Sequence, residues 1–457
     1  MLVNRLHDIA RGKSRKSDDI TAAASDWLQS PPSASAAGAI VALAWAYTLP
    51  SLVKHLEGRL WWRLFHRLHE TARESVAAGF VADSLGGQLY GGELPRLFAY
   101  QFPELADARS LVEASRRTLC ESLPELLDGQ GAPHARHIPI YRALAACWTR
   151  CATIAEAGGG KSGSGKAESS KSWNREAAAQ YEWVVRHLLR TARHDGSQAL
   201  TTEPTCDGPR SEALLRAALR LGGNKIDRAL ATVALPGHKA KTTAAEWEPP
   251  SMESEWGQHA LLRRDWSRKT PQLHIAFDAG VTMLELAHGR RRLLQGLHDF
   301  AVTLDGRPVA RRADSHWELV CWETDDDVDY LELEMELDGG TRVQRSYLLI
   351  REDDALLMSD VVLTTGASKL RHRVCLPLAD GVVFNAEQET RDGWLAADKP
   401  LVRVLPLGLP EWRVDPRGGQ MFMEEGVLVV EQEVEGSSLM APLFLDLSRR
   451  RGKWEGT

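Results

Sequence analysis

The sequence predicts an α+β protein in which an all-α domain precedes an antiparallel β domain. Two observations carry this prediction. Hydrophobic residues recur at helical spacing up to about residue 235, and they alternate with polar residues, at the spacing of a strand, from about residue 255. A polar connection that contains prolines lies between the two. We therefore expect an all-α domain over 1–235, a linker over 236–257 and an antiparallel β-sandwich over 258–450.

The helical domain is predicted from amphipathic stretches with recognisable ends. The apolar stretch AAGAIVALAWAYTLP ends at Pro50 and is too short to cross a bilayer, so we expect a buried helix there and no membrane span. The stretch GRLWWRLFHRLHETARESVAAGF places Leu60, Phe65 and Leu68 on one side and arginines on the other. Further helices are expected to end at Gly129, near Gly196, and at the glycine pair of RSEALLRAALRLGG.

The β domain is predicted from alternation and turn residues. YLELEMEL, over 330–337, alternates strictly between apolar side chains and glutamates. RSYLLIREDDALLMSDVVL indicates a hairpin whose tip is 351–354, and GVLVVEQEVEG and APLFLDLS add two further strands. Turns at short intervals are typical of an antiparallel sandwich.

The stretch GGGKSGSGKAESSKS superficially resembles a phosphate-binding loop. Its two reading frames each fail by one residue, because Ala167 stands where a hydroxyl is needed and Ala155 where the first glycine is needed. The flanking segments are helical, whereas such a loop joins a strand to a helix. We therefore expect a flexible loop over 157–172 and no bound nucleotide.

Composition excludes some classes of protein. A formal net charge of −6 argues against a nucleic-acid-binding protein, which normally has a basic face. Six cysteines without a CxxC pair are typical of thiols in a reducing compartment. The N-terminus has no apolar segment or cleavage site of a secretory signal, so a cytoplasmic location is expected.

Two stretches resemble heparinase II/III-like polysaccharide lyases. In 86–148, QFPELADA, LLDGQG and Tyr141 follow one another in the family's order. In 259–296, HALLRRDWSRKTPQLHIAFDAGVTMLELAHGRRRLLQG is similar to the strands that open the family's sandwich, and TRVQRSYLLIREDDALLMSDVVL resembles a later hairpin. The resemblance implies an incomplete α/α toroid followed by a β-sandwich. It also implies β-elimination on an anionic polysaccharide or oligosaccharide that contains uronic acid.

The resemblance implies a set of site residues. A lyase of this kind needs a base, a neutraliser of the carboxylate and a proton donor. Tyr141 matches the family's catalytic tyrosine in order, and His134 and His137 in the preceding loop are the other catalytic candidates. The candidates for substrate binding are Gln88, Tyr90, Arg136, Trp62 and His66. No cofactor is expected.

The sequence also departs from the family's pattern. Gln88-Leu89 stands where the family carries Asn-His, and of the sandwich histidines only His288 is nearby. Two hypotheses therefore stay open: a lyase, or a non-catalytic relative that binds a glycan or a protein and has lost the catalytic histidines. The residue types of a zinc site occur at His134, His137, Cys147 and Cys151, but cysteines four apart in an apolar helix favour buried thiols, so no metal is expected.

Overall fold

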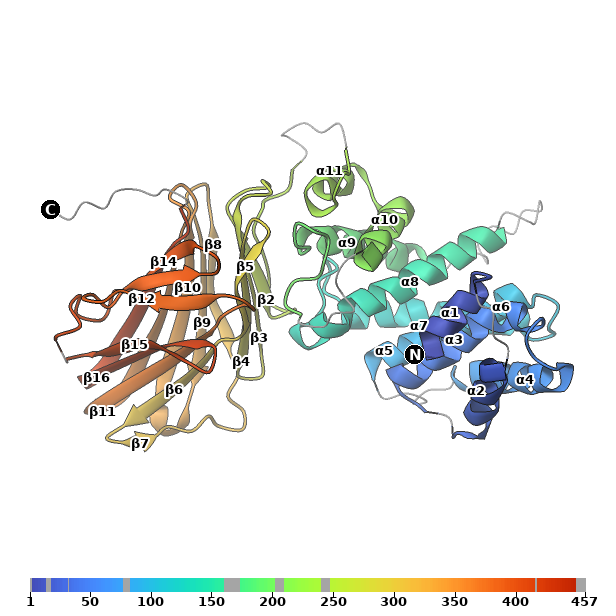
Figure 1. The fold of residues 1–457 in the computed structure, drawn as a ribbon, viewed down its shortest axis with the longest axis horizontal. Helices are drawn as coiled ribbons and strands as arrows, with labels where there is room; N and C mark the ends of the chain where they lie inside the picture. The colour runs from blue at the N-terminus through green and yellow to red at the C-terminus, as the bar shows by residue number, and fades with distance from the viewer. Residues whose placement is uncertain are drawn as a thin grey trace. The chain divides into compact units, whose positions relative to one another are not determined.

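The computed structural model describes residues 2–13, 18–31, 33–76, 83–159, 173–201, 209–239, 247–415 and 417–448 (Figure 1). The described chain divides into two compact units. The helical unit consists of Met1–Gly131, Ile140–Arg186 and Ala213–Asn224. The sheet unit consists of Ala132–Pro139, His187–Glu212 and Lys225–Thr457. The units interleave along the sequence, so the chain leaves the helical unit and returns to it before the first strand begins.

Helices fill the described chain as far as Ala234. They are α1 (Leu2–Ala10), α2 (Asp18–Gln29), α3 (Ala36–Leu52), α4 (Gly58–Glu74), α5 (Ser84–Gly87), the π-helix η1 (Gln88–Glu93), α6 (Leu94–Gln101), α7 (Ala108–Leu126), the 3₁₀ turn η2 (Ala135–His137), α8 (Ile138–Gly159), α9 (Arg175–Arg190), α10 (Pro209–Gly222) and α11 (Lys225–Ala234). Among these described helices, none combines the length and the apolarity that crossing a membrane requires.

The helices follow the apolar periodicity of the sequence. In α4, Leu64, Phe65 and Leu68 are buried and Leu60 is half-buried, whereas three of the four arginines are exposed, namely Arg59, Arg63 and Arg73. Helix α3 continues through Pro50 and ends at Leu52. Pro50 has no N–H to donate to the carbonyl of Ala46, and the helix ends two residues after it. The predicted loop 157–172 begins inside α8, which ends at Gly159; residues 160–172 lie outside the described residues.

Strands begin at Met252. They are β1 (Met252–Ser254), β2 (His259–Arg263), β3 (Pro271–Asp278), β4 (Val281–His288), β5 (Arg291–Leu297), β6 (Asp299–Leu304), β7 (Arg307–Pro308), β8 (Glu318–Thr324), β9 (Val328–Glu336), the 3₁₀ turn η5 (Asp338–Gly340), β10 (Arg342–Ile350), β11 (Ala355–Pro377), β12 (Val383–Ala386), β13 (Gly393–Ala396), β14 (Pro400–Pro406), β15 (Gly419–Glu424) and β16 (Val427–Asp446). The structure thus has helices first and antiparallel strands second, as the sequence predicts.

The described strands form two antiparallel sheets. The smaller has the order β1-β2-β3-β4-β5, and the larger has the order β12-β13-β14-β16-β11-β10-β9-β8, with β15 on β16 and β6 on β11. Alternate side chains of β9 and β10 point into one hydrophobic core that takes residues from both sheets, among them Leu273, Leu331 and Tyr347. The predicted hairpin tip is confirmed, since Ile350 pairs with Ala355.

One strand prediction was wrong. The segments GVLVVEQEVEG and APLFLDLS are not two strands but parts of the single strand β16, which pairs with β11 over most of its length. The glycine and serines between the segments suggest a turn in the sequence, yet the chain stays extended there and only the register shifts, between Leu363 and Ser368 of β11.

Candidate functional site

The predicted site residues fall into different units. His134, Arg136 and His137 belong to the sheet unit; Gln88, Tyr90, Tyr141, Trp62 and His66 belong to the helical unit. Within the sheet unit, the three loop residues come from Ala132–Pro139, a short segment that stands between two segments of the helical unit in the sequence. These three predicted site residues therefore lie close together within a single unit.

The loop 132–139 is fixed to the small sheet by its apolar side. Ala135 and Ile138 are buried against Ala276 of β3, with Met283 of β4 packed beside them. The backbone N–H of Ala135 donates to the carbonyl of Gly257 at 2.7 Å. The side chain of Gln198 donates to the carbonyl of Ile138. These contacts hold η2 in place. They bury Ala135 and Ile138, whereas His134 and His137 stay half-buried and Arg136 stays exposed.

His134 and His137 are the two histidines of this loop. His134 is the N-cap of η2 and His137 is its last residue, and the backbone N–H of His137 donates to the carbonyl of His134 at 2.8 Å, so the two histidines stand at the two ends of one turn. The Nδ1 of His134 accepts from the backbone N–H of Arg136 at 3.4 Å, which leaves the Nε2 of His134 to carry the proton. In the described chain, the imidazole of His137 is not bonded to any other group, and both rings are half-buried.

The pKa values of both histidines are lowered. Burial is the main cause for each, and the Arg136 guanidinium adds to it, while Asp278 acts in the opposite direction. For His137 the neighbouring His134 lowers the pKa further. Both imidazoles are therefore neutral at pH 7, which is the form in which histidine can accept a proton.

A cation and an aromatic ring stand beside the histidines. Arg136 is exposed, and no described carboxylate forms an ion pair with it. Trp256, in the turn between β1 and β2, is 47% exposed and meets the ring of His134 edge to face, with 5.8 Å between centroids. We call His134, Arg136, His137 and Trp256 the loop site. It combines a free positive charge, neutral imidazoles and an apolar ring.

Tyr141 is not part of this surface. Its side chain is 3% exposed, and its hydroxyl donates to the carbonyl of Gly131 at 2.8 Å within the helical unit. Burial raises the pKa of Tyr141 well above its ordinary value. The phenol of Tyr141 therefore stays protonated, and its proton is used in the hydrogen bond to Gly131. In this structure Tyr141 makes a structural contact, and a catalytic role for it stays a prediction.

Gln88 and Tyr90 are likewise used within the helical unit. The amide of Gln88 donates to Ser122 at 2.7 Å and accepts from the indole N–H of Trp148 at 2.9 Å, and its side chain is 3% exposed. Gln88 thus joins η1 to α7 and α8, and substrate binding by Gln88 stays a prediction. The hydroxyl of Tyr90 donates to the carbonyl of Ser33 at 2.9 Å.

Trp62 and His66 lie on the outer face of α4. Trp62 is 54% exposed, and its ring lies 5.8 Å from that of His66, one turn along the helix. Trp61 points the other way and donates its indole N–H to the carbonyl of Leu49. Substrate binding by Trp62 and His66 stays a prediction.

The sequence did not reveal a polar layer buried under the small sheet. Arg193 donates to both carboxylate oxygens of Glu285, at 2.6 and 2.7 Å, and both side chains are buried. Beside this pair, the Nε2 of His194 lies 2.8 Å from the amide of Gln272. Burial, followed by Arg263 and Arg268, lowers the pKa of His194 to about 4. Glu285 breaks the apolar face of VTMLELAH, and that break was the available signal.

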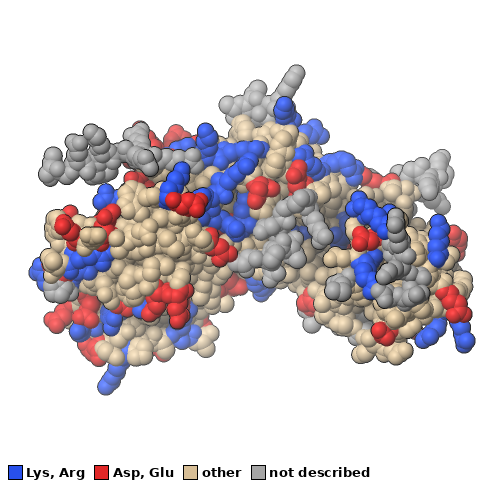
Figure 2. All heavy atoms as spheres, in the orientation of Figure 1, with Lys and Arg blue, Asp and Glu red and all other residues tan. Residues whose placement is uncertain are grey.

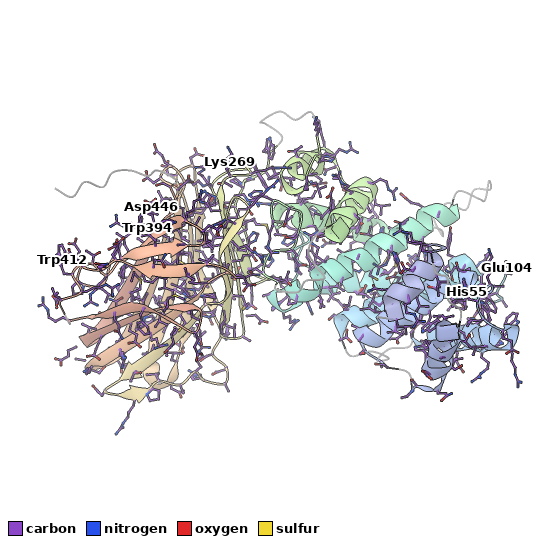
Figure 3. All side chains as sticks on the ribbon, viewed as in Figure 1. His55, Glu104, Lys269, Trp394, Trp412 and Asp446 are labelled. Atoms are coloured by element: carbon purple, nitrogen blue, oxygen red, sulfur yellow. The ribbon has the colours of Figure 1, made fainter. Side chains whose placement is uncertain are left out.

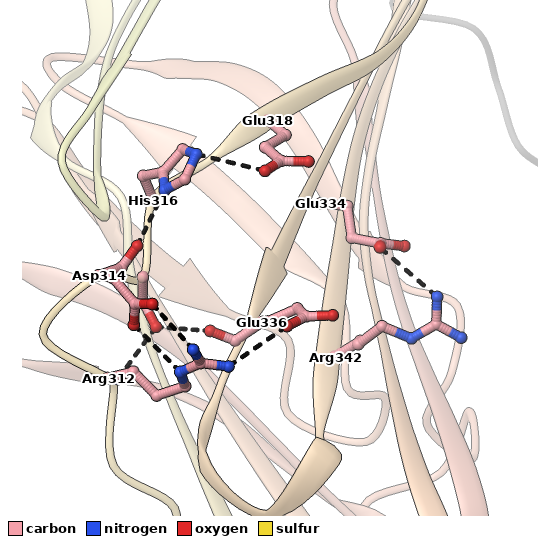
Figure 4. A network of polar contacts seen from close by, with 8 residues as sticks. Arg312, Asp314, His316, Glu318, Glu334, Glu336 and Arg342 are labelled. Atoms are coloured by element: carbon pink, nitrogen blue, oxygen red, sulfur yellow. Dashed lines mark hydrogen bonds and ion pairs between the residues drawn. The ribbon is translucent and has the colours of Figure 1, made fainter.

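The described chain offers no metal site. A polar cavity of about 310 Å³ at β8 and β9 holds Asp314, Glu318 and Glu336 (Figure 4). These carboxylates are exposed and already paired, Asp314 and Glu336 with Arg312 and Glu318 with His316. No group of three or more described His, Cys, Asp or Glu side chains is arranged to hold a metal ion.

Other surface features are less specific than the loop site. Trp394 and Trp412 lie in the sheet unit in Figure 3. Trp412 is 51% exposed, but the indole N–H of Trp394 donates to Glu387 and Arg403 lies over its ring, so Trp394 is engaged. On the face drawn in Figure 2, basic and acidic side chains occur together over the strands, and no continuous basic face is visible there.

No protein-family model matches the sequence, and no curated protein matches it. Several solved structures do. A heparinase III gene product aligns with a TM-score of 0.63 and 11% identity, over 90% of this chain and 66% of that one. A heparan sulfate lyase from Pedobacter heparinus aligns with a TM-score of 0.60 and 12% identity, over 91% and 69%. A xanthan lyase from Paenibacillus aligns with a TM-score of 0.57 and 10% identity, over 98% and 53%.

This likeness confirms, at the level of the fold, the predicted resemblance to heparinase II/III-like polysaccharide lyases. At 10–12% identity, the likeness is one of fold. The chain spans about two thirds of the length of the first two structures and about half of the third.

Proposed function

We propose, proceeding from this lyase fold, that the chain acts on an anionic polysaccharide that contains uronic acid, and that it cleaves the polymer by β-elimination at the loop site. The observation that carries the proposal is that one turn bears two neutral histidines and an arginine that forms no ion pair with any carboxylate in the described part of the chain. We further propose that the helices form an incomplete α/α toroid and the two sheets a β-sandwich.

Substrate binding in this proposal depends on Arg136 and Trp256. The guanidinium forms a two-pronged hydrogen-bonded pair with the uronate carboxylate, as arginine does with planar anions. The positive charge also stabilises the negative charge that develops on the carboxylate when the neighbouring carbon loses its proton. The exposed face of Trp256 offers an apolar platform for a sugar ring.

Proton transfer is assigned to His137, assisted by His134. Neutral His137 removes the proton from the carbon beside the carboxylate, and the electron pair forms a double bond as the bond to the glycosidic oxygen breaks. The imidazolium of His137 that forms passes this proton on to the glycosidic oxygen, so His137 returns to its neutral form, and the Nε2–H of neutral His134, whose Nδ1 accepts from the backbone N–H of Arg136, donates a hydrogen bond to that oxygen. The rate should fall as the pH falls through the lowered pKa of His137, since protonation removes the base.

The test is the ultraviolet absorbance of unsaturated uronate, followed while the full chain is offered a panel of uronic-acid polymers. We expect turnover of at least one polymer. His137→Gln should then lower the rate by roughly 10²–10⁴-fold, and Arg136→Gln should weaken both binding and turnover. His316→Gln is the matched control, because His316 is an exposed histidine of the same unit that lies outside the loop site. Loss of activity in His316→Gln as large as in His137→Gln would contradict the assignment.

The burial of Gln88 and Tyr141 is the observation behind a second proposal, that of a non-catalytic relative. If these positions no longer serve catalysis, the protein binds the glycan without cleaving it. In that case the wild type gives no ultraviolet signal on any polymer, yet a polymer is retained in a binding assay and Arg136→Gln releases it. The absence of a nucleotide or nucleic acid partner and the cytoplasmic location stay predictions.

A further inference from the structure

The helical unit contains a cavity of about 290 Å³ that the proposed function does not use. It lies among α2, α3 and α4, and its lining includes Trp27, Pro31, Ala37, Val41, Arg67 and Tyr90. The apolar part of the lining surface exceeds the polar part several-fold. The volume is at the lower end of the range of ligand pockets, roughly 300–1,000 Å³, so the cavity suits a single ring and not a polymer.

Arg67 supplies the charge in this cavity. It is the charged residue among the described lining residues, and its guanidinium forms neither a hydrogen bond nor an ion pair with any described group. Burial raises the pKa of Tyr90, and Arg67 acts against that rise, which places the guanidinium close to the phenol. Burying a charge without a partner is costly, and a guanidinium pairs well with a carboxylate, so an anion that enters the cavity would be stabilised by Arg67.

The hydroxyl groups of the lining are already engaged. Tyr90 donates to the carbonyl of Ser33, Thr71 donates to the carbonyl of Arg67, and Ser30 donates to the carbonyl of Asp26. A sugar acid would bring several hydroxyls into this cavity, and each would lose its hydrogen bonds to water without replacement. An apolar ring has no such cost.

Trp27 gives the cavity an apolar wall. It is half-buried, and Trp45, which is fully buried, supports it from behind with 6.1 Å between the ring centroids. A ring that enters the cavity can therefore lie against a fixed indole, as aromatic pairs prefer.

We propose that this cavity binds a small aromatic or alicyclic monocarboxylate, whose ring lies against Trp27 and whose carboxylate pairs with Arg67. The cavity would recognise the ligand through the charge of Arg67 and the ring of Trp27. It is separate from the loop site, which lies in the other unit, and it does not depend on the proposed function.

The test is calorimetric titration of the full chain with sodium benzoate, neutral benzyl alcohol and sodium glucuronate. We expect benzoate to bind with one-to-one stoichiometry, and to bind about tenfold or more tightly than either of the others. Quenching or a shift of tryptophan fluorescence should accompany benzoate binding. No benzoate binding by the folded wild type, or tighter binding of glucuronate, would overturn the proposal.

Two variants on different helices locate the site. Arg67→Gln removes the charge, and Ala37→Met fills the cavity from α3; each should weaken benzoate binding about tenfold or more. Arg63→Gln and Ala34→Met are the matched controls, since both residues are exposed and lie outside the lining. If circular dichroism shows that Arg67→Gln does not fold, the loss of benzoate binding in Ala37→Met tests the site instead. Equal losses in a variant and its control would reject the site.

Discussion

Asp360 shows how the sheet unit holds a charge in its core. It accepts from Arg345 through both carboxylate oxygens, each at 2.7 Å, and His372 lies 3.2 Å away; all three side chains are almost fully buried. Burial works against ionisation, but the Arg345 guanidinium overcomes it and holds the pKa of Asp360 far below its usual range. Because this pKa is lowered by folding, its stabilising contribution is present above about pH 4 and is lost as the pH falls further.

We predict that Asp360→Asn lowers the free energy of unfolding by about 3–5 kcal/mol, because it leaves the charge of Arg345 buried without a counterion. Urea unfolding at pH 7 measures this. Asp314→Asn is the matched control, since Asp314 forms its pair with Arg312 on the exposed surface and should give no measurable change. Similar losses in the two variants would show that the buried pair contributes no more than the exposed one.

Tyr141 is the residue at which the structural and catalytic interpretations differ most clearly. Tyr141→Phe removes the hydrogen bond to the carbonyl of Gly131, so we expect a loss of about 0.5–1.5 kcal/mol in the free energy of unfolding. Turnover or glycan binding should stay unchanged. A loss of activity on the scale of His137→Gln, without a matching loss of stability, would support the predicted catalytic role of Tyr141.

The element that carries this contact is the turn between α7 and η2. Gly131 has a φ of +76°, and a Cβ there would lie 2.4 Å from the carbonyl carbon of Trp183 and 2.5 Å from the nitrogen of Val184, both in the backbone of α9. Position 131 requires glycine for two reasons: the backbone is in the left-handed conformation, and the backbone of α9 lies too close for a Cβ.

We predict that Gly131→Ala lowers the free energy of unfolding by at least about 2 kcal/mol, through the combined cost of backbone strain and overpacking. Gly129→Ala, two residues earlier in the same turn, is the control, because a Cβ there meets nothing within 4 Å. Thermal unfolding of the two variants compares them directly. Equal melting temperatures would mean that α9 can shift away from the turn without cost.

The whole molecule carries a pH dependence set by buried histidines. Burial is the main cause that lowers the pKa of His194, to about 4, and those of His274 and His298 well below the ordinary value. The unfolded chain takes up protons on these groups near pH 6.5, whereas the folded chain does not. Since the unfolded state binds more protons in this window, stability falls as the pH falls.

We predict that the free energy of unfolding decreases steadily between about pH 6.5 and pH 4, with His194 alone contributing up to about 3 kcal/mol. Urea titrations at several pH values measure the slope. His194→Gln should flatten it, whereas His316→Gln, at an exposed histidine, should leave it unchanged. A stability that does not vary between these limits would contradict the burial of neutral imidazoles.

Local sequence patterns could predict the order of helices and strands. They could not predict which segments belong to the helical unit and which to the sheet unit. The apolar periodicity of α4 and the alternation in β9 depend on neighbours in the sequence, and both predictions are confirmed. The segments 132–139 and 187–212 join the sheet unit through distant partners, such as Arg193 with Glu285, and no periodicity records such a pairing.

The site was predictable in part for the same reason. A loop that carries His134, Arg136 and His137 together is visible in the sequence, because the three residues are neighbours. Whether a polar side chain points outward or inward is decided by packing. Gln88 and Tyr141 have residue types suited to a site, yet Ser122, Trp148 and Gly131 occupy their polar atoms. Trp256, far along the chain from the loop, had no local signal.

The interleaving of the two units has a consequence for synthesis on the ribosome. Residues 132–139 leave the exit tunnel well before β3 and β4, the strands on which Ala135 and Ile138 pack. Residues 132–139 therefore have no packing partner until the rest of the helical unit and then β3 and β4 have been synthesised. Domains that are contiguous in sequence can fold one after the other as they emerge, but here residues 132–139 of the sheet unit depend on β3 and β4, which are made more than a hundred residues later. A chaperone that shields apolar segments during this interval would be expected to raise the yield of folded protein.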